Sequence, residues 1–357
     1  MKVGILTFHR AINYGAILQC YALYTILKQL GYDVYVIDYR QPVIEQNRLD
    51  LRWEHIWNNR LHWGNIYRYL KTYSYRRNTR KKFQVFSKQY LHFTPKCVRA
   101  SIPQNIDLYL IGSDQVWTIA HTGGYDPVLW GAFNHSSKAR VCGYAISSNI
   151  TSIEAIDKKI LCESIHQFFM LSVREKTIKD KLNEYSSLPI RVDIDPTLLL
   201  SPQSWNELID DSWGEKNDYI VIYQARHLPG KESLLYDKAR VMASQMGITD
   251  IIDLSTYDYT PQEFVSIIKH ARYVLTTSFH GAVFGLIFHK QMIVFKLNDG
   301  HDDRYIDLLE ATGMGCLLKD IECNPLPERC DYNILDERLA SLRQSSVSYL
   351  KSLKNIL

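Results

Sequence analysis

The chain has 357 residues, which is too long for one ordinary hydrophobic core and fits two domains of typical size. Hydrophobic residues make up 46% and charged residues 22%, as in globular proteins, and no apolar run reaches the roughly 20 residues that a membrane span needs. The net charge of +4 is small, and residues 1–8 turn polar too soon for a signal peptide, so we expect a cytoplasmic protein.

Apolar strands alternate with helices along the first 200 residues. We predict strands at 2–8, 34–38, 108–111, 139–146 and 168–173, and a long helix at 16–30. Strands that alternate with helices indicate a mainly parallel sheet with helices on both faces. The polar residues 195–218 contain proline and are interpreted as a linker.

The same alternation resumes after the predicted linker. We predict strands at 219–223, 251–254, 273–276 and 292–295, and helices at 232–246, from 260 onward, at 281–289 and at 335–353. The fold class is therefore α/β, with two facing Rossmann-like domains and a central cleft. We divide the chain into an N-terminal domain at 1–200, a C-terminal domain at 201–330 and a C-terminal helix at 331–357.

The segment between Arg48 and Lys96 is both basic and aromatic. It carries twelve Lys and Arg against two acidic residues, which leaves the rest of the chain net acidic. This combination is typical of contact with an anionic partner, either the inner face of a membrane or a phosphorylated substrate. An ordinary helical pair that packs its aromatic side chains on the N-terminal domain explains the pattern equally well. No nucleic-acid-binding motif accompanies the charge, so we do not expect a nucleic-acid partner.

Seven cysteines are scattered along the chain without a C-x-x-C pair. Their odd number argues against a disulfide framework and for a reducing compartment. No spacing typical of metal ligands occurs, so we predict a site without a metal or an organic cofactor.

Polar residues follow the predicted strands of the N-terminal domain, where ligands of open α/β sheets bind. Asn13, Tyr14 and Gly15 lead into a helix N-terminus that could hold sugar hydroxyls, although a plain strand–helix connection has the same pattern. After residues 108–111, Asp114 is a possible general base and Trp117 a possible stacking wall for a sugar. The alternative for Asp114 is a helix cap.

Arg174 follows the strand at 168–173, and its planar guanidinium suits a carboxylate or phosphate. The alternative is a structural salt bridge with Glu175 or Asp195. Lys296 follows the strand at 292–295, and a polar loop at 298–303 leads to Arg304. Both cations could serve the same ligand, or simply lie at the surface or pair with neighbouring carboxylates.

His280 is the strongest candidate for chemistry. It lies between an apolar strand and a helix that is hydrophobic all round and therefore buried, with Ser278 before it and Gly281 after it. The helix N-terminus attracts anions, and imidazole is the side chain suited to proton transfer at neutral pH. A buried structural histidine is the alternative. The pattern favours a small substrate with phosphate and carboxylate groups.

In several motifs the sequence resembles the polysaccharide pyruvyl transferases, in particular their bacterial capsule and exopolysaccharide branch. The matching segments cover the chain to about residue 320 and occur in the family's order: 4–9, 13–16, 18–19, Gly112 to Trp117, 172–175, 195–197 and 278–281.

This resemblance implies a GT-B-like fold and phosphoenolpyruvate as donor, from which a pyruvate ketal is formed across two hydroxyls of a sugar with release of phosphate. It implies that Arg174 and Lys296 hold the donor and that His280 is the acid, with Asp114 helping the attacking hydroxyl. Relatives often carry arginine where this chain has Ser278. Arg226 or Arg304 would then supply the missing donor contact.

The resemblance also implies a glycan acceptor, lipid-linked or soluble, for which we consider one that contains galactose. Two other functions stay open: a GT-B glycosyltransferase that uses a nucleotide sugar, and a non-catalytic subunit that binds glycans or a membrane through residues 48–96.

Overall fold

The computed structural model describes residues 1–41, 43–44, 63–209, 213–216, 218–224, 226, 228–298 and 302–356. The first part of the basic segment, at 48–62, and residues 299–301 of the predicted polar loop lie outside the described residues.

The first sheet has six strands in the order β2-β1-β3-β4-β5-β6. The strand β1 pairs in parallel with both β2 and β3, so that Val3 lies opposite Val34 on one side and Leu108 on the other. Apolar side chains bury this sheet on both faces, as parallel sheets require. Its strands are Lys2–Leu6 (β1), Asp33–Val36 (β2), Leu108–Ile111 (β3), Arg140–Ile146 (β4), Met170–Val173 (β5) and Ile190–Val192 (β6).

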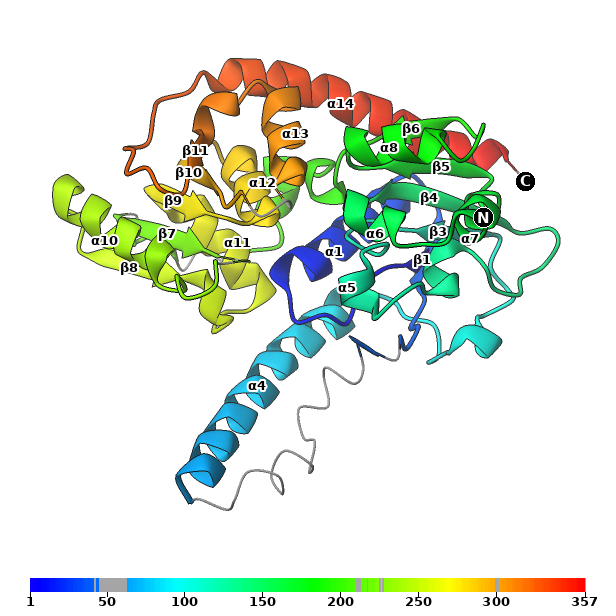
Figure 1. Cartoon of the computed structure of the whole chain (residues 1–357), viewed down its shortest axis with the longest axis horizontal. Coiled ribbons are helices and arrows are strands. Elements are labelled where there is room, and N and C mark those ends of the chain that lie inside the picture. The colour runs from blue at the N-terminus through cyan, green and yellow to red at the C-terminus, as the bar shows by residue number, and fades with distance from the viewer. Residues whose placement is uncertain are drawn as a thin grey trace. The chain divides into compact units, whose positions relative to one another are not determined.

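Helices connect these strands (Figure 1). They are Tyr14–Gln29 (α1), Trp63–Tyr90 (α4), Ile119–Thr122 (α5), Ile150–Glu154 (α6), Lys158–Ile165 (α7) and Lys176–Asn183 (α8).

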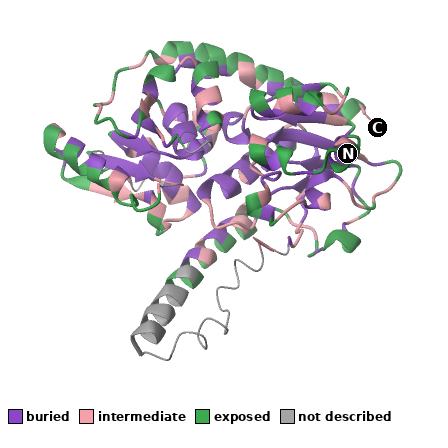
Figure 2. Cartoon of the chain, viewed as in Figure 1, coloured by how far each residue is buried: buried purple, intermediate pink, exposed green. Residues whose placement is uncertain are grey.

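The second sheet has five parallel strands in the order β11-β10-β9-β7-β8. The strands β7, β9 and β10 at its centre are buried along most of their length (Figure 2). Its strands are Tyr219–Tyr223 (β7), Asp250–Asp253 (β8), Tyr273–Thr276 (β9), Gln291–Lys296 (β10) and Leu318–Asp320 (β11). The helices of this region are Pro202–Asn206 (α9), Leu234–Met246 (α10), Pro261–His270 (α11), Phe279–Ile287 (α12), Asp303–Thr312 (α13) and Tyr332–Ser352 (α14).

By its internal contacts the chain divides into two compact units. The first comprises Met1–Leu171 and Tyr185–Pro189, and the second comprises Ser172–Glu184 and Ile190–Ile356. The second unit therefore contains the turn after β5 and the segment after β6. The domain limits that we drew at residues 200 and 330 stay a prediction.

The predicted fold class is confirmed, because the chain forms two parallel sheets flanked by helices. The prediction missed β6 and β11, since both are short edge strands that carry polar residues. The interpretation of 195–218 as a linker was wrong over its first part. Trp205 of α9 and Leu198 are fully buried there, so this segment belongs to the core.

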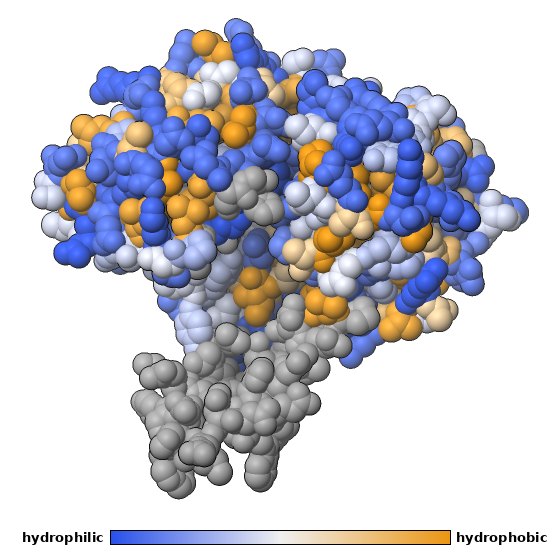
Figure 3. Space-filling model, viewed as in Figure 1, coloured by the Kyte–Doolittle hydropathy of each residue, from blue (hydrophilic) through white to orange (hydrophobic). Residues whose placement is uncertain are grey.

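Residues 63–90 of the basic segment form α4, and aromatic side chains near its C-terminal end pack on other elements of the first unit. Phe83 lies against Tyr14, with ring centroids 5.2 Å apart, and Phe86 lies against Tyr21 at 5.8 Å. Several basic residues of the same helix, among them Arg77, Lys81 and Lys88, are exposed. The contacts of Phe83 and Phe86 are thus structural. None of the helices in the described ranges is long and apolar enough to cross a membrane. On the coloured part of the face in Figure 3, hydrophilic side chains predominate and hydrophobic ones are scattered among them.

Candidate functional site

The turn between β9 and α12 contains the strongest candidate of the sequence. Ser278 occupies the N-cap position of α12, with an extended backbone at φ −109° and ψ 138°, but its side chain does not cap the helix. Instead, its backbone N–H donates to Thr276 Oγ1 over 2.9 Å. A Cβ atom on Gly281 would lie 2.2 Å from that same oxygen, so only glycine allows this approach. The turn therefore brings an uncapped helix N-terminus to the end of a buried strand.

His280 is the second residue of α12, and it is only 6% exposed. Its Nε2 atom lies 3.7 Å from Asp195 Oδ2, which is within ion-pair distance but too far for a hydrogen bond. Nε2 makes no hydrogen bond to any residue that the structure describes. A buried polar atom without such a bond is costly and needs an explanation, and a ligand would supply one.

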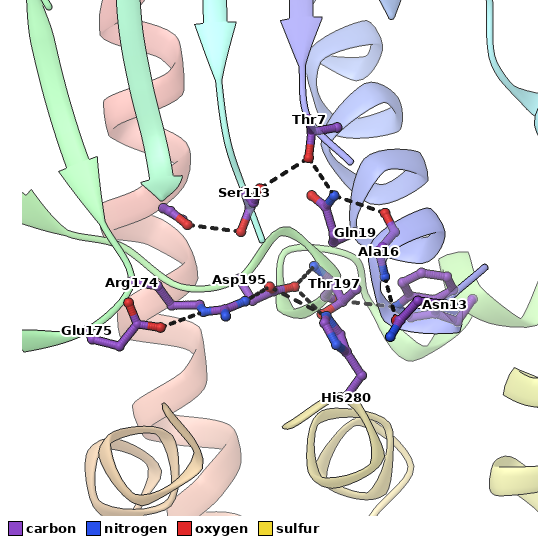
Figure 4. A network of polar contacts seen from close by, with 12 residues as sticks. Thr7, Asn13, Ala16, Gln19, Ser113, Arg174, Glu175, Asp195, Thr197 and His280 are labelled. Atoms are coloured by element: carbon purple, nitrogen blue, oxygen red, sulfur yellow. Dashed lines mark hydrogen bonds and ion pairs between the residues drawn. The ribbon is translucent and has the colours of Figure 1, made fainter. Parts of the chain in front are cut away.

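Asp195 is the centre of a buried polar network in the second unit (Figure 4). Its Oδ2 atom accepts a hydrogen bond of 2.6 Å from Arg174 Nη1, and its Oδ1 atom accepts bonds from Thr197 N at 3.0 Å and Thr197 Oγ1 at 2.6 Å. Arg174 Nε donates to Glu175 over 3.1 Å, and its guanidinium lies 4.2 Å from the centroid of the Phe279 ring. The expected structural salt bridges of Arg174 are therefore present, and they tie the end of β5 to the start of α12.

The charge state of Asp195 follows from its neighbours. Complete burial by itself raises the pKa of this carboxyl, but His280, Arg174 and Thr197 outweigh that effect and hold the pKa well below its usual range. Asp195 is thus an anion at any physiological pH. Its carboxylate is placed to orient the imidazole of His280 and to stabilise it whenever it carries a proton.

The C-terminal helix holds the segment that presents Asp195. Ser346 of α14 donates to Asp193 over 2.9 Å and accepts a bond from Ile194 N over 3.2 Å. Ser346 and Asp193 are both buried. The predicted C-terminal helix therefore positions a residue of the site.

The other predicted cations lie in different surroundings. Arg226 pairs with the buried Asp302 over 2.8 Å, and its backbone carbonyl accepts a bond of 2.9 Å from Thr277 next to the α12 turn. Lys296 is the last residue of β10 rather than the first residue after it, and it pairs with Asp320 on the neighbouring strand over 3.1 Å. The polar contacts around His280 therefore do not include Lys296.

Arg304 lines a pocket of about 300 Å³ in the second unit, together with Arg174 and Phe279. Its charged lining contains three basic residues and four acidic ones: Arg174, Lys176 and Arg304, against Asp193, Asp195, Asp307 and Glu310. Burial, opposed by a bond from Lys176 N, raises the pKa of the Asp307 carboxyl. A ligand with several negative charges is disfavoured there, so we do not assign the anionic donor to this pocket.

In the first unit, Asn13 is the N-cap of α1, and its side chain accepts a bond of 3.1 Å from Ala16 N. Tyr14 and Gly15 are buried in the first turn of that helix. The structure corrects the prediction for Trp117, which is 1% exposed, stacks on Trp130 at 3.8 Å and donates its indole N–H to Leu129 O. This ring belongs to the core and has no face for a sugar. Tyr14 is fully buried as well, so the same correction applies to it.

Asp114 lies in the turn after β3, half-buried, with a positive φ of 66°. It does not cap a helix, because α5 begins only at Ile119 with Thr118 at its N-cap. The alternative interpretation of Asp114 as a helix cap is therefore wrong, whereas its role as a general base stays a prediction. Gly112 before it is required, since a Cβ there would lie 2.3 Å from Tyr144 O.

A second histidine–aspartate pair lies just after the ends of β1 and β2. His9 Nε2 bonds to Asp38 over 3.0 Å, and Arg40 donates to the other carboxylate oxygen over 2.6 Å. Partial burial raises the pKa of Asp38, but His9 and Arg40 outweigh it and lower the pKa to about 2. In the sequence, the position of His9 after a predicted strand is the sole indication of this pair. Among the described residues no group of three or more His, Cys, Asp or Glu could hold a metal ion.

An α/β fold with two parallel sheets, in which a buried histidine, a carboxylate and an arginine meet at a helix N-terminus, has the features of an enzyme that acts on an anionic substrate. The family of polysaccharide pyruvyl transferases matches residues 13–299. This match covers most of the chain, which therefore belongs to that family and is a transferase.

Solved structures resemble the chain only distantly. One is a UDP-GlcNAc 2-epimerase from Methanocaldococcus jannaschii in complex with UDP-GlcNAc and UDP, with 12% identity, 99% of this chain and 100% of that chain covered, and a TM-score of 0.48. Another is Alr3699/HepE from Anabaena in complex with UDP and glucose, with 11% identity, coverage of 99% and 95%, and a TM-score of 0.43. A third is an alpha-glucosyltransferase in complex with UDP, with 9% identity, coverage of 99% and 94%, and a TM-score of 0.45. No curated protein matched the sequence.

Proposed function

We propose that this transferase moves pyruvate from phosphoenolpyruvate to two hydroxyls of a sugar in a polysaccharide precursor, forming a pyruvate ketal and releasing phosphate. The observation that carries the proposal is the buried Nε2 atom of His280, which lies beside the ionised Asp195 without a hydrogen bond to a described residue. Membership of the pyruvyl transferase family supports the choice of donor.

The anionic donor is proposed to lie at the N-terminus of α12. The first N–H groups of a helix have no partner within the helix, and Ser278 does not cap them with its side chain. They can therefore receive the phosphate or carboxylate oxygens of phosphoenolpyruvate. Arg226, which pairs with Asp302, lies beside the turn. Gly281 keeps the turn narrow enough for this approach.

In the proposed reaction, His280 gives a proton to the methylene carbon of the donor while a sugar hydroxyl attacks the central carbon. The bond to the phosphate oxygen then breaks, and phosphate leaves and takes up the proton of the first hydroxyl. The second hydroxyl adds to the same carbon to close the ketal and returns its proton to His280. Asp195 stabilises the imidazolium before the proton is transferred. Arg174 acts mainly through Asp195 and Phe279, while Asp114 stays the predicted base for the hydroxyl and Asn13 and Gly15 the predicted acceptor contacts.

The proposed acceptor and cellular location rest on the family and on the exposed surface of α4. We propose a glycan that contains galactose, lipid-linked or soluble, as part of bacterial capsule or exopolysaccharide synthesis. The exposed basic residues of α4 support contact with the inner face of a membrane, because anionic lipids attract such clusters. We retain the cytoplasmic assignment as part of this proposal, along with the prediction that no metal, cofactor or nucleic acid takes part.

Incubation of the purified protein with phosphoenolpyruvate and galactose-containing glycans tests the proposal. We expect release of phosphate together with an acceptor whose mass rises by one pyruvate ketal. A parallel thermal-shift measurement compares phosphoenolpyruvate with UDP. Stabilisation by UDP alone, with no release of phosphate, would instead support the nucleotide-sugar glycosyltransferase that the sequence left open.

A further inference from the structure

Two cysteines lie side by side in the second unit. Cys316 belongs to the short helix Gly315–Leu317 before β11, and Cys330 lies just before α14. Their Sγ atoms are 2.6 Å apart, although the two residues are fourteen positions apart in the chain. Both are free thiols, Cys316 exposed and Cys330 half-buried. The sequence spacing gave no indication that they meet.

Other contacts hold this segment in place without the thiols. Lys319 of β11 pairs with Glu328 over 2.6 Å, which joins the two ends of the intervening loop. Asp331 caps α14 by accepting a bond from Asn333 N over 3.0 Å, and the Tyr332 hydroxyl donates to Lys290 O. The two sulfur atoms are therefore brought together by the fold itself.

The two thiols differ in accessibility. Burial is the largest cause that raises the pKa of Cys330, and the neighbouring Cys316 and Glu328 raise it further, to about 12. Cys330 therefore stays a thiol at neutral pH. Cys316 is exposed and is the sulfur that an oxidant in solution reaches first. Such an arrangement provides an attacking residue and an adjacent resolving residue.

We propose that Cys316 and Cys330 are an oxidation site at which the protein forms an intramolecular disulfide when it meets a peroxide. The Sγ atom of Cys316 attacks the peroxide, whose O–O bond breaks, and the products are a sulfenic acid and one water molecule. The thiol of Cys330 then attacks this sulfur and the S–O bond breaks. The proton of Cys330 passes to the departing hydroxyl, which leaves as a second water molecule. Two thiols and one hydrogen peroxide thus give one disulfide and two waters, and a dithiol reductant reverses the oxidation.

The cross-link would close a loop of fifteen residues and fix the start of α14 to the edge of the second sheet. The same helix carries Ser346, which holds the segment of Asp195. The proposal concerns the thiols alone and does not depend on the proposed transferase reaction.

The remaining cysteines provide internal controls. Cys20, Cys97 and Cys142 are buried, and burial raises the pKa of all three, to about 11 for Cys97 and about 12 for Cys142. Cys323 is the matched control, because it is exposed and lies in the same loop but has no sulfur beside it among the described residues.

The full chain is treated with hydrogen peroxide, its remaining thiols are alkylated, and it is digested without reductant for mass mapping. We expect one linked peptide pair that joins Cys316 to Cys330, with a loss of about 2 Da for the two hydrogens. Cys323→Ser retains this link, whereas Cys330→Ser and the exposed Cys316→Ser both lack it. The oxidised wild type should also melt a few degrees higher than the reduced protein, and a dithiol should reverse that shift.

Two results would overturn the proposal. One is a link between Cys316 and Cys323, which would show that exposure rather than the observed pairing decides the reaction. The other is recovery of Cys316 as a sulfinic acid while Cys330 remains alkylatable, which would show that the second thiol does not resolve the first. Cys316→Ser changes an exposed side chain, so we expect this variant to fold. The same melting curve checks its folding.

Discussion

The helices α1 and α12 each follow a strand of a parallel sheet, and their N-termini differ. The start of α1 in the first unit is capped, because the side chain of Asn13 accepts a hydrogen bond from Ala16 N. Nearby, Gln19 donates to Thr7 Oγ1 over 2.8 Å and Thr7 donates to Ser113 O over 3.1 Å. The start of α12 in the second unit has no side-chain cap, and it carries a buried histidine without a hydrogen bond to the described residues.

The comparison teaches that position at a strand end does not by itself identify a site. Both turns follow the rule that ligands bind beyond the carboxyl ends of parallel strands. Among the described residues both turns leave one buried polar atom without a hydrogen bond, and the two turns differ in what that atom is. In the α1 turn Asn13 caps the helix, and the unbonded atom is Oε1 of Gln19, an amide oxygen. The α12 turn has no side-chain cap, and its unbonded atom is Nε2 of His280, a side chain suited to proton transfer.

Replacement of His280 should have the largest effect on activity. His280→Gln keeps a polar side chain of similar size but cannot transfer a proton, so we expect phosphate release to fall by about 10²- to 10⁴-fold. The measurement is release of phosphate from phosphoenolpyruvate in the presence of acceptor, with a melting curve to confirm folding. His289→Gln, at an exposed histidine just after the same helix, serves as control and should stay active. Full activity of His280→Gln would refute the assignment of the acid.

Replacement of Asp195 should have the largest effect on stability. Asp195→Asn removes the charge that pairs with Arg174, and loss of one partner of a buried ion pair costs about 3 to 5 kcal/mol. Urea unfolding at pH 7 measures this loss. A change below about 1 kcal/mol would contradict the view that this carboxylate holds the network together.

The pH dependence of the same variant gives a second measurement. Because the pKa of Asp195 is lowered in the folded protein, its contribution to the free energy of unfolding is complete above the unfolded value of about 3.9 and is lost as the pH falls below it. The difference in stability between wild type and Asp195→Asn should therefore stay the same from pH 7 to about pH 4 and shrink as the pH falls further. A constant difference below about pH 4 would show that the folded and unfolded pKa values are alike.

Replacement of Gly281 tests the geometry of the α12 turn. Gly281→Ala places a methyl group 2.2 Å from Thr276 Oγ1, and the displacement should cost about 1 to 3 kcal/mol. Gly315→Ala is the matched control, because a Cβ there meets no atom within 4 Å. Denaturant unfolding of both variants checks the prediction, and equal stabilities would mean that the turn adapts without cost.

Much of the fold follows from the sequence, because apolar periodicity and turn residues report local structure. The strands at 108–111, 219–223 and 273–276 were predicted with their observed ends. The helix after Thr260 begins as expected, with a capping box between Thr260 and Glu263. The edge strands β6 and β11 escaped prediction, since their polar residues break the apolar pattern.

The site was predicted only in part, because local sequence patterns do not show which residues far apart in the chain contact each other. His280 was identified from its place at a buried helix, but Asp195 lay within the predicted linker, and its contact with His280 spans 85 positions. From the sequence we also predicted that Trp117 contacts the ligand. In the structure this aromatic residue is part of the core. Burial and hydrogen bonding, which decide such cases, require the structure.

The smallest predicted effect compares the two helix starts directly. Asn13→Ala removes the side-chain cap of α1 and should destabilise the protein by about 0.5 to 2 kcal/mol, whereas Ser278→Ala removes no cap and should change stability by less than about 0.5 kcal/mol. Ser278→Ala should instead raise the KM for phosphoenolpyruvate if the hydroxyl contacts the donor. Melting curves and steady-state kinetics separate the two effects. Equal destabilisation by both variants would show that Ser278 caps α12 in solution. The two helices would then not differ in side-chain capping at their N-termini.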